Sequence, residues 1–170
     1  MEIKSPQREI EYKPVVKDDG TLVLKRKDKI YSGKKSKSSG GQFELRVRRD
    51  LEEKGWIVDK WSNNLDFESG GIIPAKRRFN PFSKVMSIGT GFPDFVAFQK
   101  MPSGLFRVVG VEVKVGGKLS RIEKEKCVRY LEMGVFNQIL VAKKVKEKNR
   151  VRVEYLDFEE IKRKMRKPKQ

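Results

Sequence analysis

The sequence predicts an α/β domain built on a mixed sheet, and three observations lead to this prediction. Apolar residues recur at helical spacing within 39–55 and 120–134, so each segment is expected to bury one side. Short apolar or alternating stretches, which are typical of strands, lie between and after these helices. A strand, a helix and a second strand follow one another over 105–143, an order that favours a right-handed crossover between parallel strands.

Residues 1–37 are predicted to form a basic N-terminal arm. Two apolar stretches flank an Asp-Gly turn in VVKDDGTLVLK, which indicates a hairpin from about 13 to 25. The following YSGKKSKSSGG (31–41) is rich in Lys, Ser and Gly, a composition typical of a flexible basic linker. The role of the arm stays open between a dimer contact, a DNA clamp and a disordered tail.

The first helix is expected to be capped by Ser38 or Ser39 and to end at Gly55. Its buried side is expected to consist of Phe43, Val47 and Leu51, which are spaced every four residues.

Three strands are predicted after this helix. The first is WIVDKW at 56–61, and the Gly and Pro residues of 62–86 indicate an irregular connection. The other two strands, at 94–99 and 105–115, are joined by a turn at MPSG.

A second helix is predicted to begin after Ser120, which forms a capping box with Glu123, and to end at Gly134. Its buried side is expected to include Ile122, Val128 and Leu131.

The chain is then expected to add two strands and a helix. The apolar QILVAK at 138–143 is typical of a buried strand, and the alternating VRVEYL at 151–156 is typical of an edge strand. Asp157 caps a last helix, which continues into a basic tail. The predicted organisation is the arm at 1–37, the domain at 38–160 and the tail at 161–170.

The composition favours a nucleic-acid partner. Lys and Arg number 40 against 23 Asp and Glu, which gives a net charge of +17 and a pI of about 10.0. An excess of this size, clustered along the chain, favours binding to a polyanion. A merely soluble, Lys-rich protein is the alternative.

Several classes of function are excluded by what the sequence lacks. It has no His and a single Cys, Cys127, so His-based catalysis, zinc sites and an internal disulfide are excluded. No apolar run approaches the roughly 18 residues of a membrane span, and no N-terminal signal segment is visible. We therefore expect a cytoplasmic protein whose chemistry depends on Asp, Glu, Lys or Tyr.

A pair of carboxylates is the strongest candidate for chemistry. Glu112 and Lys114 share one face of their strand, while valines take the other. If the two strands joined by MPSG form a hairpin, Asp94 and Glu112 are about equally far from its tip and converge. Two such carboxylates repel unless a cation lies between them, and oxygen ligands without His favour Mg²⁺ or Mn²⁺. A face exposed to water is the alternative.

Glu44 is a third acidic candidate. It follows Phe43, at the margin of the buried side of the first helix. It is either an ordinary surface residue or one that a helix packed on the sheet brings to the metal.

Pro93-Asp94 followed by Glu-Val-Lys at 112–114 resembles the motif of the PD-(D/E)XK nuclease superfamily. The segment KLSRIEKEKCVRYLEMG is similar to the helix after that motif, where these enzymes often have K-L-S-x-x-Q and this chain has Glu123. In these features the chain resembles the small archaeal and viral Holliday junction resolvases and the virus-type replication-repair nuclease domains.

The resemblance implies a restriction-endonuclease-like αβββαβ core and a phosphodiesterase that uses Mg²⁺, with Mn²⁺ as a substitute. It implies that Asp94, Glu112, the main-chain carbonyl of Val113 and Glu44 hold the metal. Lys114 would orient or help to deprotonate the attacking water, or stabilise the transition state. The expected products carry a 5′-phosphate and a 3′-hydroxyl.

Three basic segments are candidate nucleic-acid contacts. AKRRFNPFSK (75–84) mixes cations with rings that either stack on bases or pin the loop to the core, and its candidates are Lys76, Arg77, Arg78, Phe79 and Lys84. At the start of the second helix, the residues expected to hold a phosphate are Lys118, Ser120 and Arg121. Non-specific contacts are expected from Lys34, Lys35 and Lys37.

The expected function is a Mg²⁺-dependent DNA endonuclease. Cleavage of branched or Holliday-junction DNA, in DNA repair or recombination, is favoured because the chain is small, has no sequence-reading module and can act as a homodimer. A nickase or single-strand nuclease is an open alternative, as is a non-catalytic nucleic-acid-binding module. A module that only binds would have little reason to keep Asp94, Glu112 and Lys114 together.

Overall fold

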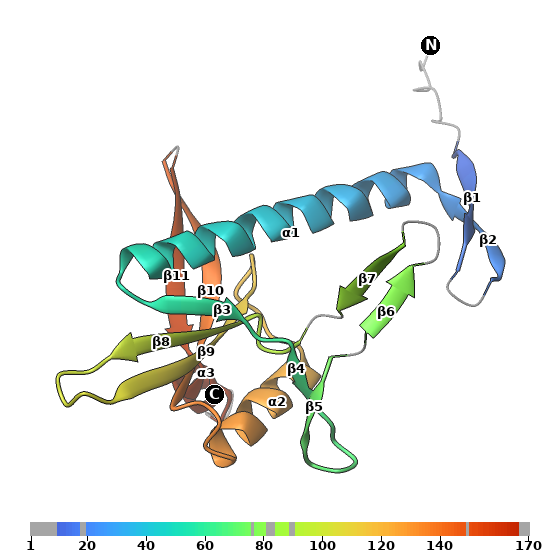
Figure 1. Cartoon of the computed structure of the whole chain (residues 1–170). Coiled ribbons are helices and arrows are strands. Elements are labelled where there is room, and N and C mark those ends of the chain that lie inside the picture. Colours follow the sequence, from blue (N-terminus) through green and yellow to red (C-terminus); the bar gives the residue numbers. More distant parts are fainter. Residues whose placement is uncertain are drawn as a thin grey trace. The chain divides into compact units, whose positions relative to one another are not determined.

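The structure is a computed structural model that describes residues 10–17, 20–75, 77–80, 84–88, 91–148 and 150–166. It divides into two compact units, Met1–Gln42 and Phe43–Gln170. In the first unit, β1 (Tyr12–Val16) pairs antiparallel with β2 (Leu22–Arg26), which confirms the predicted hairpin (Figure 1).

The expected flexible linker is wrong, because residues 31–41 are helical. They belong to α1 (Lys27–Glu53), which begins directly after β2 and not at Ser38 or Ser39. Gly lowers helix stability by about 1 kcal/mol per residue and Ser by less, but neither stops a helix that good helix formers such as Lys propagate on both sides. The predicted end is confirmed, since Gly55 has a φ of 80° just after the last turn.

A five-stranded mixed sheet, in the order β11-β10-β9-β8-β3, forms the centre of the second unit (Figure 1). Its strands are β3 (Ile57–Lys60), β8 (Phe95–Lys100), β9 (Phe106–Val113), β10 (Gln138–Glu147) and β11 (Arg150–Asp157). β9 and β10 are parallel, and all other neighbours are antiparallel. The α/β class with a mixed sheet is therefore confirmed, and β11 is an edge strand as predicted.

The part of α1 that belongs to the second unit covers one face of this sheet. Phe43, Val47 and Leu51 are buried against Val109 and Val111 of β9, as the four-residue spacing predicts. Side chains on β9 therefore alternate between this face and the opposite one.

α2 (Arg121–Glu132) covers the opposite face, where Cys127 and Tyr130 are fully buried. Val128 and Leu131 are partly buried against them, but Ile122 is exposed, so the predicted buried side is only partly correct. Ile122 lies in the first turn of α2, ahead of the turns that pack on the sheet. The predicted capping box at the start of this helix is confirmed.

α3 (Phe158–Arg166) follows β11 and adds Phe158 to the same core. The side chain of Asp157 accepts a hydrogen bond from the amide of Glu159, which confirms the predicted cap (2.9 Å). Within the described part of the chain, no helix is long and apolar enough to cross a membrane.

The expected irregular connection over 62–86 is wrong, because it contains two hairpins. Their strands are β4 (Asn63–Leu65), β5 (Ile72–Pro74), β6 (Arg77–Asn80) and β7 (Val85–Ile88), with β4 paired to β5 and β6 to β7. Strands of three or four residues are too short to show a period of two, so the sequence pattern does not predict them.

Candidate active site

The β8–β9 hairpin brings the two predicted carboxylates together. Phe95 at the start of β8 is paired with Val111, so the preceding Asp94 lies beside Glu112. The turn after β8 is closed by a hydrogen bond from the Met101 amide to the Leu105 carbonyl (2.8 Å). The predicted turn and the predicted convergence of Asp94 and Glu112 are therefore confirmed.

Close backbone packing fixes the position of Asp94. A side chain at Gly110 would place its Cβ 2.9 Å from the Cγ of Pro93, so the glycine leaves room for the proline. The Phe92 amide donates to the Asn63 carbonyl (2.9 Å), and the Trp61 amide donates to the main-chain carbonyl of Asp94 (3.2 Å). Backbone hydrogen bonds thus hold residues 92–94, the segment before β8, at its first and its last residue.

Glu112 is a buried acid on a covered sheet face. Its neighbours Val111 and Val113 pack toward α1, so Glu112 faces the α2 side, where it is only 4% exposed. Burial first, and the charge of Asp94 second, raise the pKa of its carboxyl to about 7, although Lys114 partly offsets both effects. The alternative of a strand face in water is therefore wrong for Glu112.

Asp94 is oriented by the backbone of the neighbouring strand. Its Oδ2 accepts a hydrogen bond from the Val113 amide (2.8 Å). Burial raises the pKa of this carboxyl; Val113, Lys60 and Lys114 act against the rise, while the charge of Glu44 adds to it.

The carbonyl of Val113 also faces this edge of the sheet. The Lys114 amide donates to the Ala142 carbonyl on β10 (2.9 Å). Because consecutive residues of a strand direct their polar backbone groups to opposite sides, Val113 directs its N–H and C=O toward β8. Asp94 lies there, so one carboxylate and one carbonyl share the same edge.

Lys114 is held by two carboxylates. Its Nζ lies 3.0 Å from Oε1 of Glu112 and 2.6 Å from Oε1 of Glu123. Burial alone would lower the pKa of Lys114, but the two ion pairs outweigh it and raise the pKa above its usual value. The ammonium group therefore stays charged throughout the neutral pH range.

Glu123 links the start of α2 to this lysine. Its Oε2 accepts a hydrogen bond from the Ser120 amide (2.7 Å), and its own amide donates to Ser120 Oγ (3.3 Å). Although burial acts to raise it, the pKa of the Glu123 carboxyl is lowered by Lys114 and Ser120. The sequence shows the capping box, but it does not show that the other carboxylate oxygen contacts Lys114.

Glu44 lies near the pair but is held by a different cation. Its Oε2 is 2.8 Å from Nζ of Lys60, which also lies 5.3 Å from the centre of the Phe95 ring. The charge of Glu44 contributes to the raised pKa of Asp94, so the two carboxyls interact. Lys60 is a site residue that the alternating pattern of WIVDKW does not distinguish from any other strand lysine.

The residues present fit a Mg²⁺ site of the usual protein type. Within the described residues, no group of three or more His, Cys, Asp or Glu side chains is arranged to hold a metal. Mg²⁺ is commonly bound by only one or two carboxylates together with water and substrate phosphates. Asp94, Glu112 and the Val113 carbonyl meet this requirement, and Glu44 would complete the site through water.

The predicted contacts at the start of α2 are only partly available. The amide and the hydroxyl of Ser120 are both used in the capping box with Glu123. Lys118 and Arg121 are exposed on either side of it. The prediction of a phosphate contact here therefore depends on these two cations.

The predicted contacts in 75–84 lie on the β6–β7 hairpin where the structure describes them. Arg77 and Lys84 are exposed, and Phe79 is 59% exposed, so this ring does not pin the hairpin to the core. Lys76 and Phe82 lie outside the described residues, as does the side chain of Arg78.

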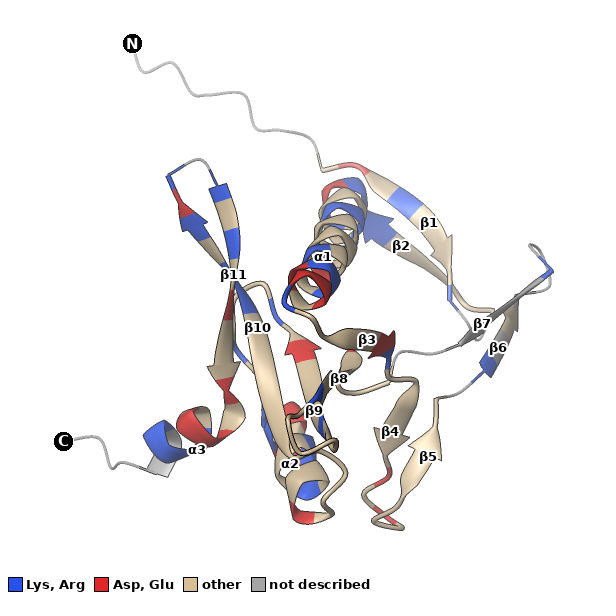
Figure 2. Ribbon diagram, turned by 60° about the vertical axis from the view of Figure 1, so that its left-hand side comes forward, with Lys and Arg blue, Asp and Glu red and all other residues tan. Residues whose placement is uncertain are grey.

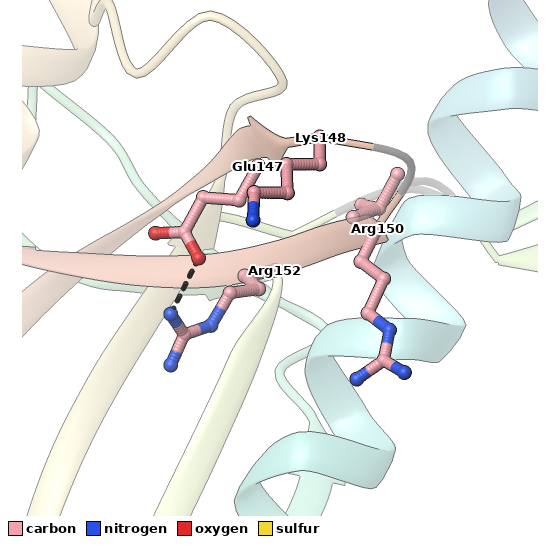
Figure 3. A pocket seen from close by; sticks show the side chains of 5 residues that line it. Glu147, Lys148, Arg150 and Arg152 are labelled. Carbon is pink, nitrogen blue, oxygen red and sulfur yellow. Dashed lines mark hydrogen bonds and ion pairs between the residues drawn. The ribbon is translucent and has the colours of Figure 1, made fainter.

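The other cations are spread over separate elements. Lys34, Lys35 and Lys37 are exposed on α1, and Figure 2 shows Lys and Arg along this helix and on both strands of the β1–β2 hairpin. A further basic hollow of about 950 Å³ lies at the turn between β10 and β11 (Figure 3). It is lined by Glu147, Lys148, Arg150, Val151 and Arg152.

This basic hollow is absent from the sequence-based candidates. Glu147 pairs with Arg152 there (2.6 Å), while Lys148 and Arg150 extend from the same turn (Figure 3). The cations are interspersed with Val and Glu, so the segment has no run of basic residues that would mark it in the sequence.

Comparisons with known proteins do not identify a relative. The sequence matches no protein-family model and no curated protein, and the structure matches no solved structure.

Proposed function

We propose that the protein is a Mg²⁺-dependent endonuclease of the PD-(D/E)XK type that cleaves DNA. The observation that carries the proposal is the convergence of Asp94 and Glu112 at one edge of a covered sheet, with Lys114 beside them. Burying two carboxylates that repel each other lowers the stability of a fold, so the presence of such a pair indicates a functional role. The order α1, β3, β8, β9, α2, β10 also agrees with a restriction-endonuclease-like core.

Each residue has a role in the proposed reaction. Asp94, Glu112 and the Val113 carbonyl would hold the metal, and the hydrogen bond from the Val113 amide keeps Asp94 in place. When bound, Mg²⁺ lowers the pKa of a coordinated water and offsets charge on the scissile phosphate. Lys114 would place a fixed positive charge beside the phosphate and orient the water, because its two ion pairs keep it protonated.

DNA is the proposed substrate because the chain is strongly basic, with a net charge of +17. The exposed Arg77, Phe79 and Lys84 of the β6–β7 hairpin supply cations and a ring that can stack on a base. Branched DNA, including the Holliday junction, is the favoured substrate, because an exposed ring suits unpaired bases at a branch point. In this proposal the protein acts in DNA repair or recombination.

A cleavage assay tests the proposal. The protein is incubated with linear, nicked, flap and four-way DNA, in Mg²⁺, in Mn²⁺ and in EDTA. We expect cleavage in either metal, strongest on branched substrates, and none in EDTA. Asp94→Asn is expected to lower the rate at least about 10²-fold, because it removes a charged metal ligand.

Asp59→Asn is the matched control, since Asp59 lies on β3 with a side chain that is mainly exposed. It should cleave like the wild type. Cleavage that persists in EDTA or in Asp94→Asn would overturn the mechanism. Binding to every substrate without cleavage would favour a non-catalytic nucleic-acid-binding module.

Glu123→Gln is predicted to lower the cleavage rate about tenfold with little change in KM, since an outer partner of a site residue typically contributes 10- to 100-fold. The variant keeps a side chain that can complete the capping box, but it removes a charge that holds Lys114. Single-turnover rates and a melting curve check the prediction. Glu125→Gln, an exposed substitution on the same helix, is the control. Equal rates for Glu123→Gln and the control would show that Glu123 only caps the helix.

A further inference from the structure

One face of the β1–β2 hairpin is apolar and exposed. Tyr12, Pro14 and Val16 alternate along β1, and the register places Leu24 opposite Pro14 and Leu22 opposite Val16. These five residues therefore share one face, which we call the arm face. The four large side chains other than Pro14 are between 55% and 67% exposed.

Within its described residues, the hairpin has no buried core of its own. No apolar residue is buried within the described part of the first unit. The first buried apolar residue along the described chain is Phe43, which belongs to the second unit. An isolated two-stranded hairpin is only marginally stable in water. An apolar face of this kind is typical of a surface that is covered by a partner.

The charges around the arm face favour a protein partner over nucleic acid. Lys13 and Lys25 are paired with each other in the register, so they lie on the opposite face of the hairpin. Arg26 shares the arm face with Tyr12, but its guanidinium is bound to both carboxylate oxygens of Asp28 (3.1 and 2.8 Å). A phosphate backbone would require unpaired cations, which this face does not present.

A second copy of the same chain meets these requirements. Two chains with a net charge of +17 repel each other over most of their surface, and a face without net charge is where they can approach. Pro14 has no N–H, so adding another strand to the edge of β1 is unfavourable, and contact face to face is preferred. The same patch on both copies is self-complementary about a two-fold axis.

We propose that the arm face is a homodimer contact, in which two hairpins pack their apolar faces together. The area of five side chains per copy is small for a stable interface. We therefore expect a dissociation constant of order 10 μM, with exchange between monomer and dimer. The proposal needs neither DNA nor metal, so it stands or fails separately from the proposed nuclease activity.

Sedimentation equilibrium on the full chain, without DNA and at about 0.5 M salt to screen repulsion, tests the proposal. Across about 1 to 200 μM, the wild type should shift from monomer to dimer. Leu24→Glu should remain monomeric, because two charged groups would face each other in the contact. Leu105→Glu is the matched control, since Leu105 is 71% exposed on the β8–β9 hairpin, and it should dimerise like the wild type.

A second variant covers the case in which Leu24→Glu unfolds the hairpin. Leu24→Cys should form a covalent dimer with a short bis-maleimide, and the native Cys127 does not compete because it is buried. A wild type that stays monomeric at all concentrations would overturn the proposal. So would a Leu24→Cys yield no higher than that of Leu105→Cys. A monomer whose affinity for DNA falls more in Leu24→Glu than in Leu105→Glu, which adds the same charge elsewhere, would assign the face to nucleic acid instead.

Discussion

Glu112→Gln is expected to abolish cleavage and at the same time to stabilise the protein at pH 8. The folded protein holds the carboxyl of Glu112 with a pKa of about 7, against an ordinary value of 4.5. The cause is burial first and the charge of Asp94 second, and Lys114 compensates only in part. Glutamine keeps the shape of the side chain and removes the buried charge.

The direction of the effect follows from proton linkage. Below pH 4.5, Glu112 is neutral in both the folded and the unfolded chain, so its full contribution to stability is present. As the pH rises from 4.5 through about 7, the unfolded chain ionises first and this contribution is lost. A shift of this size corresponds to about 3 kcal/mol above pH 7.

We therefore expect Glu112→Gln to raise the free energy of unfolding at pH 8 by about 2 to 3 kcal/mol, which is roughly 5–10 °C in Tm for a chain of this size. At pH 4 the gain should disappear. Melting curves of both proteins from pH 4 to pH 9 measure the difference. Glu125→Gln, which alters an exposed acid on α2, is the control and should leave Tm unchanged within a degree or so at every pH.

A Glu112→Gln variant that is less stable than the wild type at pH 8 would mean that the ion pair with Lys114 outweighs burial. Loss of cleavage combined with a gain in stability is the pattern expected for a residue that is required for catalysis but destabilises the folded protein. A purely structural glutamate would give the opposite sign of stability change.

The convergence of Asp94 and Glu112 could be predicted because it depends only on local geometry. The period of two fixes which side of β9 each residue faces, and the position of the MPSG turn fixes which residues are opposite each other. Both quantities can be counted along the chain. The packing of Phe43 and Val47 on the sheet was predictable for the same reason, since a four-residue spacing defines a helix face.

Other features depend on contacts between distant segments or on a balance of small energies. The contact of Lys114 with Glu123 requires the start of α2 to lie beside the end of β9. The spacing of residues along the sequence does not predict this arrangement. The pairing of Glu44 with Lys60 likewise joins a helix to a strand. The helical state of residues 31–41 reflects propagation from flanking residues, so a composition rich in Gly and Ser was misleading there.

Lys114→Ala is expected to reduce the cleavage rate about 10²- to 10³-fold, the usual cost of removing one group that stabilises transition-state charge. Lys114→Arg should recover part of that loss, because a guanidinium also stays protonated and can reach the same carboxylates. Single-turnover rates on the best substrate of the cleavage assay give both values. Lys100→Ala, at the exposed end of β8, is the control and should leave the rate unchanged.

The arginine variant separates two roles for Lys114. A lysine that acts as a general base must lose its proton near neutral pH, which requires a lowered pKa. The ion pairs with Glu112 and Glu123 instead raise the pKa of Lys114, so it is a poor base and an effective fixed charge. Arginine cannot act as a base at these pH values, and an Arg variant as inactive as Lys114→Ala would contradict the fixed-charge role.

The pH dependence of cleavage provides an independent check on the same assignment. If Lys114 is a fixed charge, we expect the cleavage rate at limiting Mg²⁺ to show an inflection near pH 7 that belongs to Glu112, which must lose its proton before it can hold a metal. Removing the ammonium group in Lys114→Ala leaves Glu112 without its compensating cation, so its pKa should rise and the inflection should move to higher pH. If Lys114 were the base, the inflection would instead disappear with the lysine. An inflection that moves to higher pH in Lys114→Ala therefore indicates a fixed charge, and an inflection that disappears indicates a general base.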